Sequence, residues 1–117
     1  MAYNHVDLQD VKADRGVFYK MRRELGVEGF GINYIEVPPD AEGMEHDETM
    51  TGHEEVYVIL DGSGTMRIGA DEVALVPGRW LRVDAAERRQ VVGGPGGMKM
   101  IMVGGTPGRS FAPREGL

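Results

Sequence analysis

Residues 43–64 of the chain read GMEHDETMTGHEEVYVILDGSG, and this stretch decides the fold. It begins with polar and acidic side chains that include His46 and His53, and it continues as an apolar run at 56–60. Such a run predicts a β-strand, and the Asp-Gly-Ser-Gly sequence at 61–64 predicts a turn that reverses the chain. Side chains of the metal-ligand type thus lead directly into a predicted strand.

Short predicted strands lie on both sides of this stretch. Residues 30–37 form a strand that ends at Pro38-Pro39, because proline cannot donate to a β-ladder. Alternating side chains at 16–25 favour a strand, although a short helix over 19–25 also fits. The other predicted strands are a short strand or edge arm within 1–15 and strands at 65–68, 72–76, 80–83, 90–92 and 98–103. Turns are predicted at 69–71, 77–78 and 93–97.

About eight or nine short strands at even spacing, with no long helix, predict an all-β antiparallel sandwich or barrel. The 18 glycines among 117 residues are about twice the usual share, which fits many tight turns. A chain of this length is typical of one domain with its own core.

Composition excludes several classes of function. The net charge of -6 argues against a nucleic-acid partner, which requires a basic surface. The absence of cysteine excludes disulfides and thiolate sites. No apolar run is long enough for a membrane helix, and the polar, acidic start is unlike a signal peptide. We therefore expect a cytoplasmic protein with no membrane partner.

The order of residues around Glu55 resembles the first motif of the cupin superfamily. Glu55 is followed by six residues and Gly62, and Pro38-Pro39 is followed by six residues and His46, which are the cupin intervals. Glu48 occupies the place of the second cupin histidine, and the gap from Glu48 to Glu55 is about two residues longer than the pattern.

The second cupin motif is similar in spacing alone, from Gly78 onwards. Asp84, Ala86, Arg89 and Gly93 stand for its proline, glycine, histidine and asparagine. The resemblance implies a double-stranded β-helix, the cupin jelly-roll barrel. It implies a single domain over 1–117, with an N-terminal arm at 1–29, the barrel at about 30–103 and an irregular tail at 104–117.

Four side chains are candidate metal ligands. Strand alternation places His53 and Glu55 on one face, while His46 and Glu48 are also two residues apart. The resemblance implies that this face is the barrel interior. Imidazole with carboxylates suits Mn, Fe, Zn or Ni, held by His46, Glu48 and Glu55 with His53 as a fourth ligand. The alternative is that His46 and Glu48 lie on a solvated loop and His53 only begins a strand.

Arg89 changes this expectation, because arginine stays charged and has no lone pair to give to a cation. At the place of the fourth cupin ligand it repels a metal and attracts a carboxylate. It either pairs with Glu55 or Glu48 or faces the anionic group of a small ligand. In a third interpretation Arg88 and Arg89 are solvated turn charges.

Aromatic and thioether side chains complete the candidate ligand-binding set. Tyr34, Tyr57 and Trp80 are predicted to line a pocket with Arg89, and the alternate methionines at 98, 100 and 102 share one strand face. The alternative for all of them is that they fill the core of a small barrel.

Two classes of function follow. The first is a small cupin-domain protein that binds a small anionic molecule in the barrel. The second is a metal-dependent cupin enzyme, of dioxygenase, isomerase or lyase type, acting on a small organic acid. The sequence does not decide whether the protein is an enzyme, although the degenerate second motif favours the binding protein. The apolar residues on both faces of 56–60 favour a homodimer, with residues 1–25 contributing to its interface.

Overall fold

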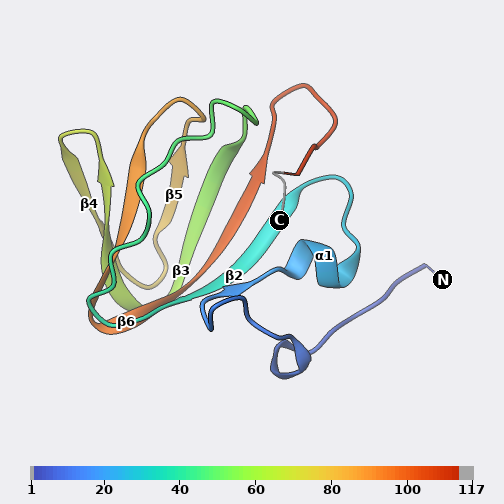
Figure 1. The fold of residues 1–117 in the computed structure, drawn as a ribbon, viewed down its shortest axis with the longest axis horizontal. Helices are drawn as coiled ribbons and strands as arrows, with labels where there is room; N and C mark the ends of the chain where they lie inside the picture. The colour runs from blue at the N-terminus through green and yellow to red at the C-terminus, as the bar shows by residue number, and fades with distance from the viewer. Residues whose placement is uncertain (1, 114–117) are drawn as a thin grey trace.

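The computed structural model describes residues 2–113, and its regular structure is mostly antiparallel β-sheet (Figure 1). The elements in chain order are η1 (Leu8–Asp10), β1 (Phe18–Tyr19), α1 (Met21–Leu25), β2 (Gly31–Val37), β3 (Glu54–Ile68), β4 (Asp71–Leu75), β5 (Trp80–Val83) and β6 (Arg89–Gly105). This content confirms the all-β class predicted from the sequence. No helix among the described residues has the length and apolarity that crossing a membrane requires.

The two longest strands, β3 and β6, each contribute to both layers of the fold. The first half of β3 pairs with β5 and with the second half of β6, which in turn pairs with β2. The second half of β3 pairs with β4 and with the first half of β6. Figure 1 shows β6 bending at the bottom of the view as it passes from one layer to the other. The two layers therefore share their longest strands.

The predicted reversing turns at 61–64 and 93–97 are wrong, because both segments lie within continuous strands. The pairing of β3 with β6 shifts register between Ile59 and Asp61 and again between Gly62 and Gly64. Gly62 and Gly97 both have a φ of 76°. A Cβ atom at Gly62 would collide with the carbonyl oxygen of Gly97. Glycine thus permits two bulged strands to cross closely at a bend instead of turning back.

The N-terminal expectations are corrected in part. Residues 2–15 form no strand; they contain the 3-10 turn η1 and an isolated β-bridge from Asp14 to Phe18. In the segment 16–25 the strand is limited to β1, and the helical alternative is realised as α1, which ends at Gly26 with a φ of 73°. The predicted strands at 30–37 and 80–83 are confirmed as β2 and β5, whereas β4 begins one residue earlier than predicted.

The core lies between the two layers. Its buried apolar side chains are Ile35, Tyr57, Ile59, Met66, Leu75, Val83, Met98 and Met100. They lie on the inner face of each strand, as alternation requires. Lys99, between the two core methionines of β6, is exposed on the opposite face.

Candidate functional site in the barrel interior

Three donor side chains meet inside the barrel. His46 Nε2 lies 3.4 Å from Glu48 Oε2 and 3.9 Å from Glu55 Oε1. One donor atom from each of the three residues lies within 4.8 Å of the others. Both carboxylates are buried, whereas the His46 side chain is 31% exposed. The cluster therefore has one partly open side, at the imidazole.

Backbone pairing places His46 and Glu48 opposite β3. The N–H of His46 donates to the carbonyl oxygen of Arg89 at 3.0 Å, and the N–H of Arg89 donates back to that of His46 at 2.8 Å. The N–H of Glu48 then donates to the carbonyl oxygen of Ala85 at 2.8 Å. His46 thus forms an isolated β-bridge with Arg89 at the start of β6, and the solvated-loop alternative is wrong for Glu48, whose side chain is 5% exposed.

The Glu55 carboxylate is held in its charged form by its neighbours. The hydroxyl of Tyr57 donates to Glu55 Oε1 at 2.6 Å. Burial raises the pKa of Glu55, but the nearby imidazole of His46, the hydrogen bond from Tyr57 and the charge of Arg89 outweigh burial and lower this pKa below its usual value. Burial, followed by the nearby Glu55 charge, raises the pKa of Tyr57 well above its usual value. Tyr57 is therefore a hydrogen-bond donor to Glu55 at neutral pH.

His46 is oriented by its own backbone. Its Nδ1–H donates to the carbonyl oxygen of Met44 at 3.2 Å, so that Nε2 faces the two carboxylates. The Glu55 carboxylate beside Nε2 raises the pKa of His46, and burial opposes this effect without cancelling it. The imidazole is consequently disposed to hold a proton, or another cation, between Glu48 and Glu55.

Arg89 is the most deeply buried charge of the cluster, with 0% exposure, so the interpretation of Arg89 as a solvated turn charge is wrong. Its Nη2 donates to the carbonyl oxygen of Asp84 at 3.2 Å and lies 3.7 Å from Glu55 Oε1. Within residues 2–113, its Nε and Nη1 atoms have no hydrogen-bond partner. Arg88, by contrast, is exposed and pairs with Glu45 at 3.0 Å.

His53 lies beside the cluster but is engaged elsewhere. Its Nδ1 is 4.0 Å from Glu48 Oε1, which is longer than a hydrogen bond. Its Nε2–H donates to the carbonyl oxygen of Ala112 at 2.8 Å, and its ring stacks on Phe111 with centroids 5.0 Å apart. His53 therefore contacts the C-terminal tail and does not join the three-donor group.

Two of the predicted pocket residues lie away from the cluster. Tyr34 is on the outer face of β2, where its ring packs against Tyr19 with centroids 5.2 Å apart. Trp80 is 72% exposed and pairs through its backbone with Val58 on that same outer face. The interior position of Tyr57 follows from strand alternation, and alternation also places Asn33, which we did not single out from the sequence, on the inner face of β2.

A divalent ion fits the three-donor group. Two donors that are each 2.0–2.2 Å from one ion lie about 3–3.5 Å apart, so the spacings of 3.4 and 3.9 Å require only small movements. The neutral form of His46 with Nδ1–H directed to a backbone carbonyl presents its Nε2 lone pair to the ion. His46, Glu48 and Glu55 would hold the ion, and the ion would supply Lewis acidity next to Arg89.

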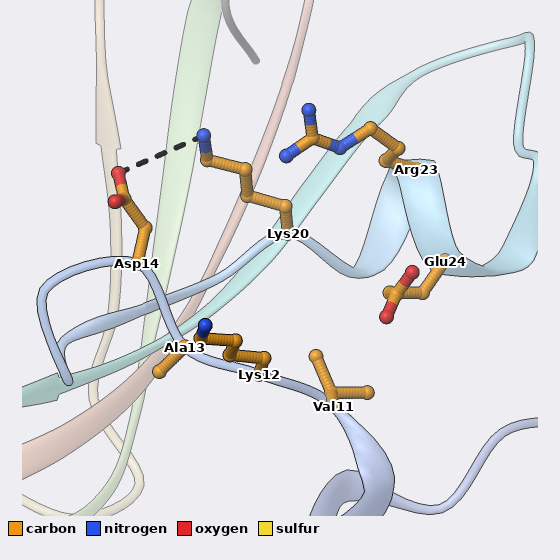
Figure 2. A pocket seen from close by; sticks show the side chains of 7 residues that line it. All are labelled: Val11, Lys12, Ala13, Asp14, Lys20, Arg23 and Glu24. Carbon is orange, nitrogen blue, oxygen red and sulfur yellow. Dashed lines mark ion pairs between the residues drawn. The ribbon is translucent and has the colours of Figure 1, made fainter.

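A cleft of about 260 Å³ lies elsewhere, between the N-terminal segment and α1 (Figure 2). Lys12, Lys20 and Arg23 line it together with two acidic residues, and Lys20 Nζ lies 3.6 Å from an oxygen of Asp14. Lys12 and Arg23 are exposed. None of the buried charges of the barrel lines this cleft, so we place the candidate site at His46, Glu48 and Glu55.

Comparisons with known proteins agree with this fold. No family model matches the chain, and no curated protein matches it in sequence. Many solved structures are similar to the chain, including the following three. A cupin protein from Bacteroides fragilis has a TM-score of 0.77 and 19% identity, over 100% of this chain and 97% of that one.

The polyketide cyclase RemF from Streptomyces resistomycificus has a TM-score of 0.74 and 22% identity, over 96% of this chain and 87% of that one. A sugar phosphate isomerase from a cupin superfamily, from Silicibacter pomeroyi, has a TM-score of 0.72 and 17% identity, over 86% of this chain and 74% of that one. The TM-scores establish the fold, whereas sequence identities this low leave the activity open. The chain is therefore a cupin-fold protein, as its sequence resemblance predicted.

Proposed function

We propose that this protein binds a small organic carboxylate in the barrel interior, with Arg89 as the residue that pairs with the carboxylate. The observation that supports the proposal is a guanidinium with 0% exposure whose Nε and Nη1 have no partner among the described residues. A buried donor left unsatisfied costs about 1–3 kcal/mol, and more when it is charged. Such a group gains more from a carboxylate than from any neutral ligand atom, because charge-assisted hydrogen bonds are the stronger ones.

Glu55 does not satisfy the free donors of Arg89. Its Oε1 is 3.7 Å from Arg89 Nη2, beyond hydrogen-bond length, and already accepts from Tyr57 at 2.6 Å. Tyr57 and Arg89 are the two members of the predicted ligand-binding set that the proposal retains. Tyr34 and Trp80 do not enter it, because both lie on the outer face of the sheet.

Isothermal titration with propanoate tests the proposal, using Arg89→Gln with Arg88→Gln as the matched control. We expect propanoate to bind the unmodified protein and the Arg88 variant with equal affinity, and to bind the Arg89 variant at least tenfold more weakly. Arg89→Lys keeps the charge and serves if the glutamine variant does not fold. Equal affinity for all variants would refute the role of Arg89.

A metal-dependent enzyme is the second candidate function, favoured by the convergence of His46, Glu48 and Glu55 on one point. With neutral His46, the two carboxylates and Arg89 sum to one negative charge. A divalent ion of Mn, Fe, Zn or Ni changes this sum to one positive charge, which one carboxylate ligand then balances. Carboxylate binding and metal binding are therefore compatible at this site. Metal analysis of the purified protein tests whether an ion is bound.

A homodimer stays part of the proposal. The outer face of the sheet presents Trp80 at 72% exposure and Leu60 at 47%, and Tyr19 of β1 lies on this face beside Tyr34. Exposed large apolar groups on one sheet face favour pairing with a second copy. Sedimentation equilibrium at micromolar concentration tests it, and Trp80→Ser is expected to shift the protein towards monomer. A cytoplasmic location stays a prediction from the sequence.

A further inference from the structure

The C-terminal tail places an aromatic ring against the inner face of β2. On the inner face, Glu55 of β3 is the register partner of Gly104 of β6. Gly104 is in turn the partner of Gly31 of β2. Neither glycine has a side chain, so this row leaves space beside the Glu55 carboxylate. A Cβ atom at Gly31 would lie 3.1 Å from Cζ of Phe111. The ring of Phe111 therefore fills the space above Gly31.

The surroundings of this ring are those of a binding subsite for a planar group. The imidazole of His53 stacks on it with centroids 5.0 Å apart and an interplanar angle of 20°. The guanidinium carbon of Arg22 lies 5.9 Å from the ring centroid, in cation–π range. Stacking and cation–π contacts favour any flat π-system and are not specific to a phenylalanine side chain.

Hydrogen bonds attach the described part of the tail, residues 106–113, to the segment before β3. The hydroxyl of Thr106 donates to the carbonyl oxygen of Thr51 at 2.8 Å, and Ala112 accepts from His53. Residues 106–113 contain no strand or helix. Displacement of this segment would thus break local contacts and leave the sheets intact.

We propose that the space filled by Phe111 is a ring-binding subsite, and that the ligand of Arg89 is an aromatic carboxylate whose ring displaces the Phe111 side chain. This inference rests on the proposed binding of a carboxylate by Arg89 and names the class of ligand. Adjacent strands are about 4.8 Å apart, so Gly31 is roughly 10 Å from Glu55. A ring joined to a carboxylate by a short linker, as in an arylalkanoate, spans the distance between the subsite and the charged cluster.

Phe111→Ala tests the subsite, with Phe18→Ala as the matched control because Phe18 pairs with Ile35, four residues along β2 from Gly31. The probes are 3-phenylpropanoate and 3-cyclohexylpropanoate, which carry the same carboxylate and differ in ring planarity. We expect the Phe111 variant to bind 3-phenylpropanoate about tenfold more tightly than the unmodified protein, because no side chain must be displaced. It should prefer the phenyl probe by about three- to tenfold, the range of one stacking contact. Arg22→Gln, added to Phe111→Ala, should reduce that preference.

Each outcome decides the inference separately from the proposed function. Equal affinities of the Phe111 variant for the phenyl and cyclohexyl probes would overturn the subsite, even if both probes require Arg89. If neither carboxylate binds any variant, the proposed function fails, and the alcohols 3-phenylpropanol and 3-cyclohexylpropanol then test the ring subsite alone. Phe111→Leu, which keeps an apolar side chain, replaces Phe111→Ala if the latter does not fold.

Discussion

Arg89 and Glu55 lie side by side in the barrel interior without a direct hydrogen bond, with 3.7 Å between Nη2 and Oε1. Arg89 is 0% exposed and the Glu55 side chain 7%. Their charges compensate each other, while part of the guanidinium stays without a partner among the described residues. The pair therefore stabilises the fold through charge compensation and keeps Arg89 donors available for a ligand.

Removing Arg89 should destabilise the fold strongly. Arg89→Ala leaves the Glu55 carboxylate buried without its compensating charge, at a cost of about 3–5 kcal/mol in the free energy of unfolding. Arg88→Ala, one residue away, removes only exposed ion pairs and should change that free energy by no more than about 0.5 kcal/mol. Urea denaturation measures both. Equal midpoints for the two variants would contradict the burial of Arg89.

Neutralising both members of the pair should recover most of that loss. Arg89→Met together with Glu55→Gln replaces two buried charges by groups of similar size, and such replacements are often neutral or stabilising. We expect the double variant to be more stable than Arg89→Met alone by at least about 2 kcal/mol. Strict additivity of the two single effects would show that the charges are not coupled.

A divalent ion should raise the melting temperature of the unmodified protein. At an ion concentration one hundred times the Kd, linkage adds about 2.7 kcal/mol, which corresponds to a shift of roughly 8–15 °C. Thermal scans with added Mn, Zn or Ni measure it. Glu48→Gln should abolish the shift, whereas His5→Ala, at an exposed histidine outside the cluster, should keep it. A shift of the same size in both variants would mean that the ion binds elsewhere.

Tyr57 should make the fold sensitive to alkaline pH. Burial and the Glu55 charge raise its pKa well above 10.0 in the folded protein. The protonated Tyr57 side chain therefore stabilises the fold fully below about pH 10, its pKa in the unfolded chain. This stabilisation is lost as the pH rises towards the pKa in the folded protein. Between pH 10 and 11.5, Tyr57→Phe should lose stability more slowly than the unmodified protein, by roughly 1.4 kcal/mol per pH unit. Tyr3→Phe, at an exposed side chain, is the control, and parallel pH curves for the Tyr57 variant and the unmodified protein would contradict the assignment.

The bend between the layers should tolerate no side chain at Gly62. Gly62→Ala combines a φ of 76° with a collision against the backbone of residue 97, so the backbone must move. Gly69→Ala has a similar φ of 58° and nothing within 4 Å of the added Cβ. The control should cost about 1–2 kcal/mol, the penalty of the left-handed conformation, and Gly62→Ala clearly more. Thermal melting of the two variants decides this, and equal losses would show that the strands can separate at the bend.

The sequence predicted the fold and most of the cluster for local reasons. Strand alternation places Tyr57 on the face of Glu55, and the interval from Pro38-Pro39 identifies His46. The bends at 61–64 and 93–97 were predicted as reversals, because local turn chemistry does not reveal whether a glycine-rich segment reverses the chain. That outcome depends on the partner strand, here on the approach of Gly62 to Gly97.

The role of Phe111 had no local signal at all. Its position depends on Arg22, Gly31 and His53, which are distant from it in sequence and lie on three separate segments. The surrounding tail residues have no apolar periodicity that marks a buried ring. Contacts of this kind follow from the assembled barrel and cannot be inferred from the tail alone.

The passage of β6 through both layers determines the order in which the chain can fold. β2 and both halves of β3 receive this partner only when residues 89–105, which follow every other described strand, have been synthesised. Until then the nascent chain exposes the unpaired edges of β2 and β3, which are templates for wrong pairing. Pairs such as Gly31 with Gly104 join residues that are far apart in the sequence, so the contact order of the fold is high. We therefore expect folding in milliseconds to seconds. Among the described strands, the one synthesised last is thus the one that completes the barrel.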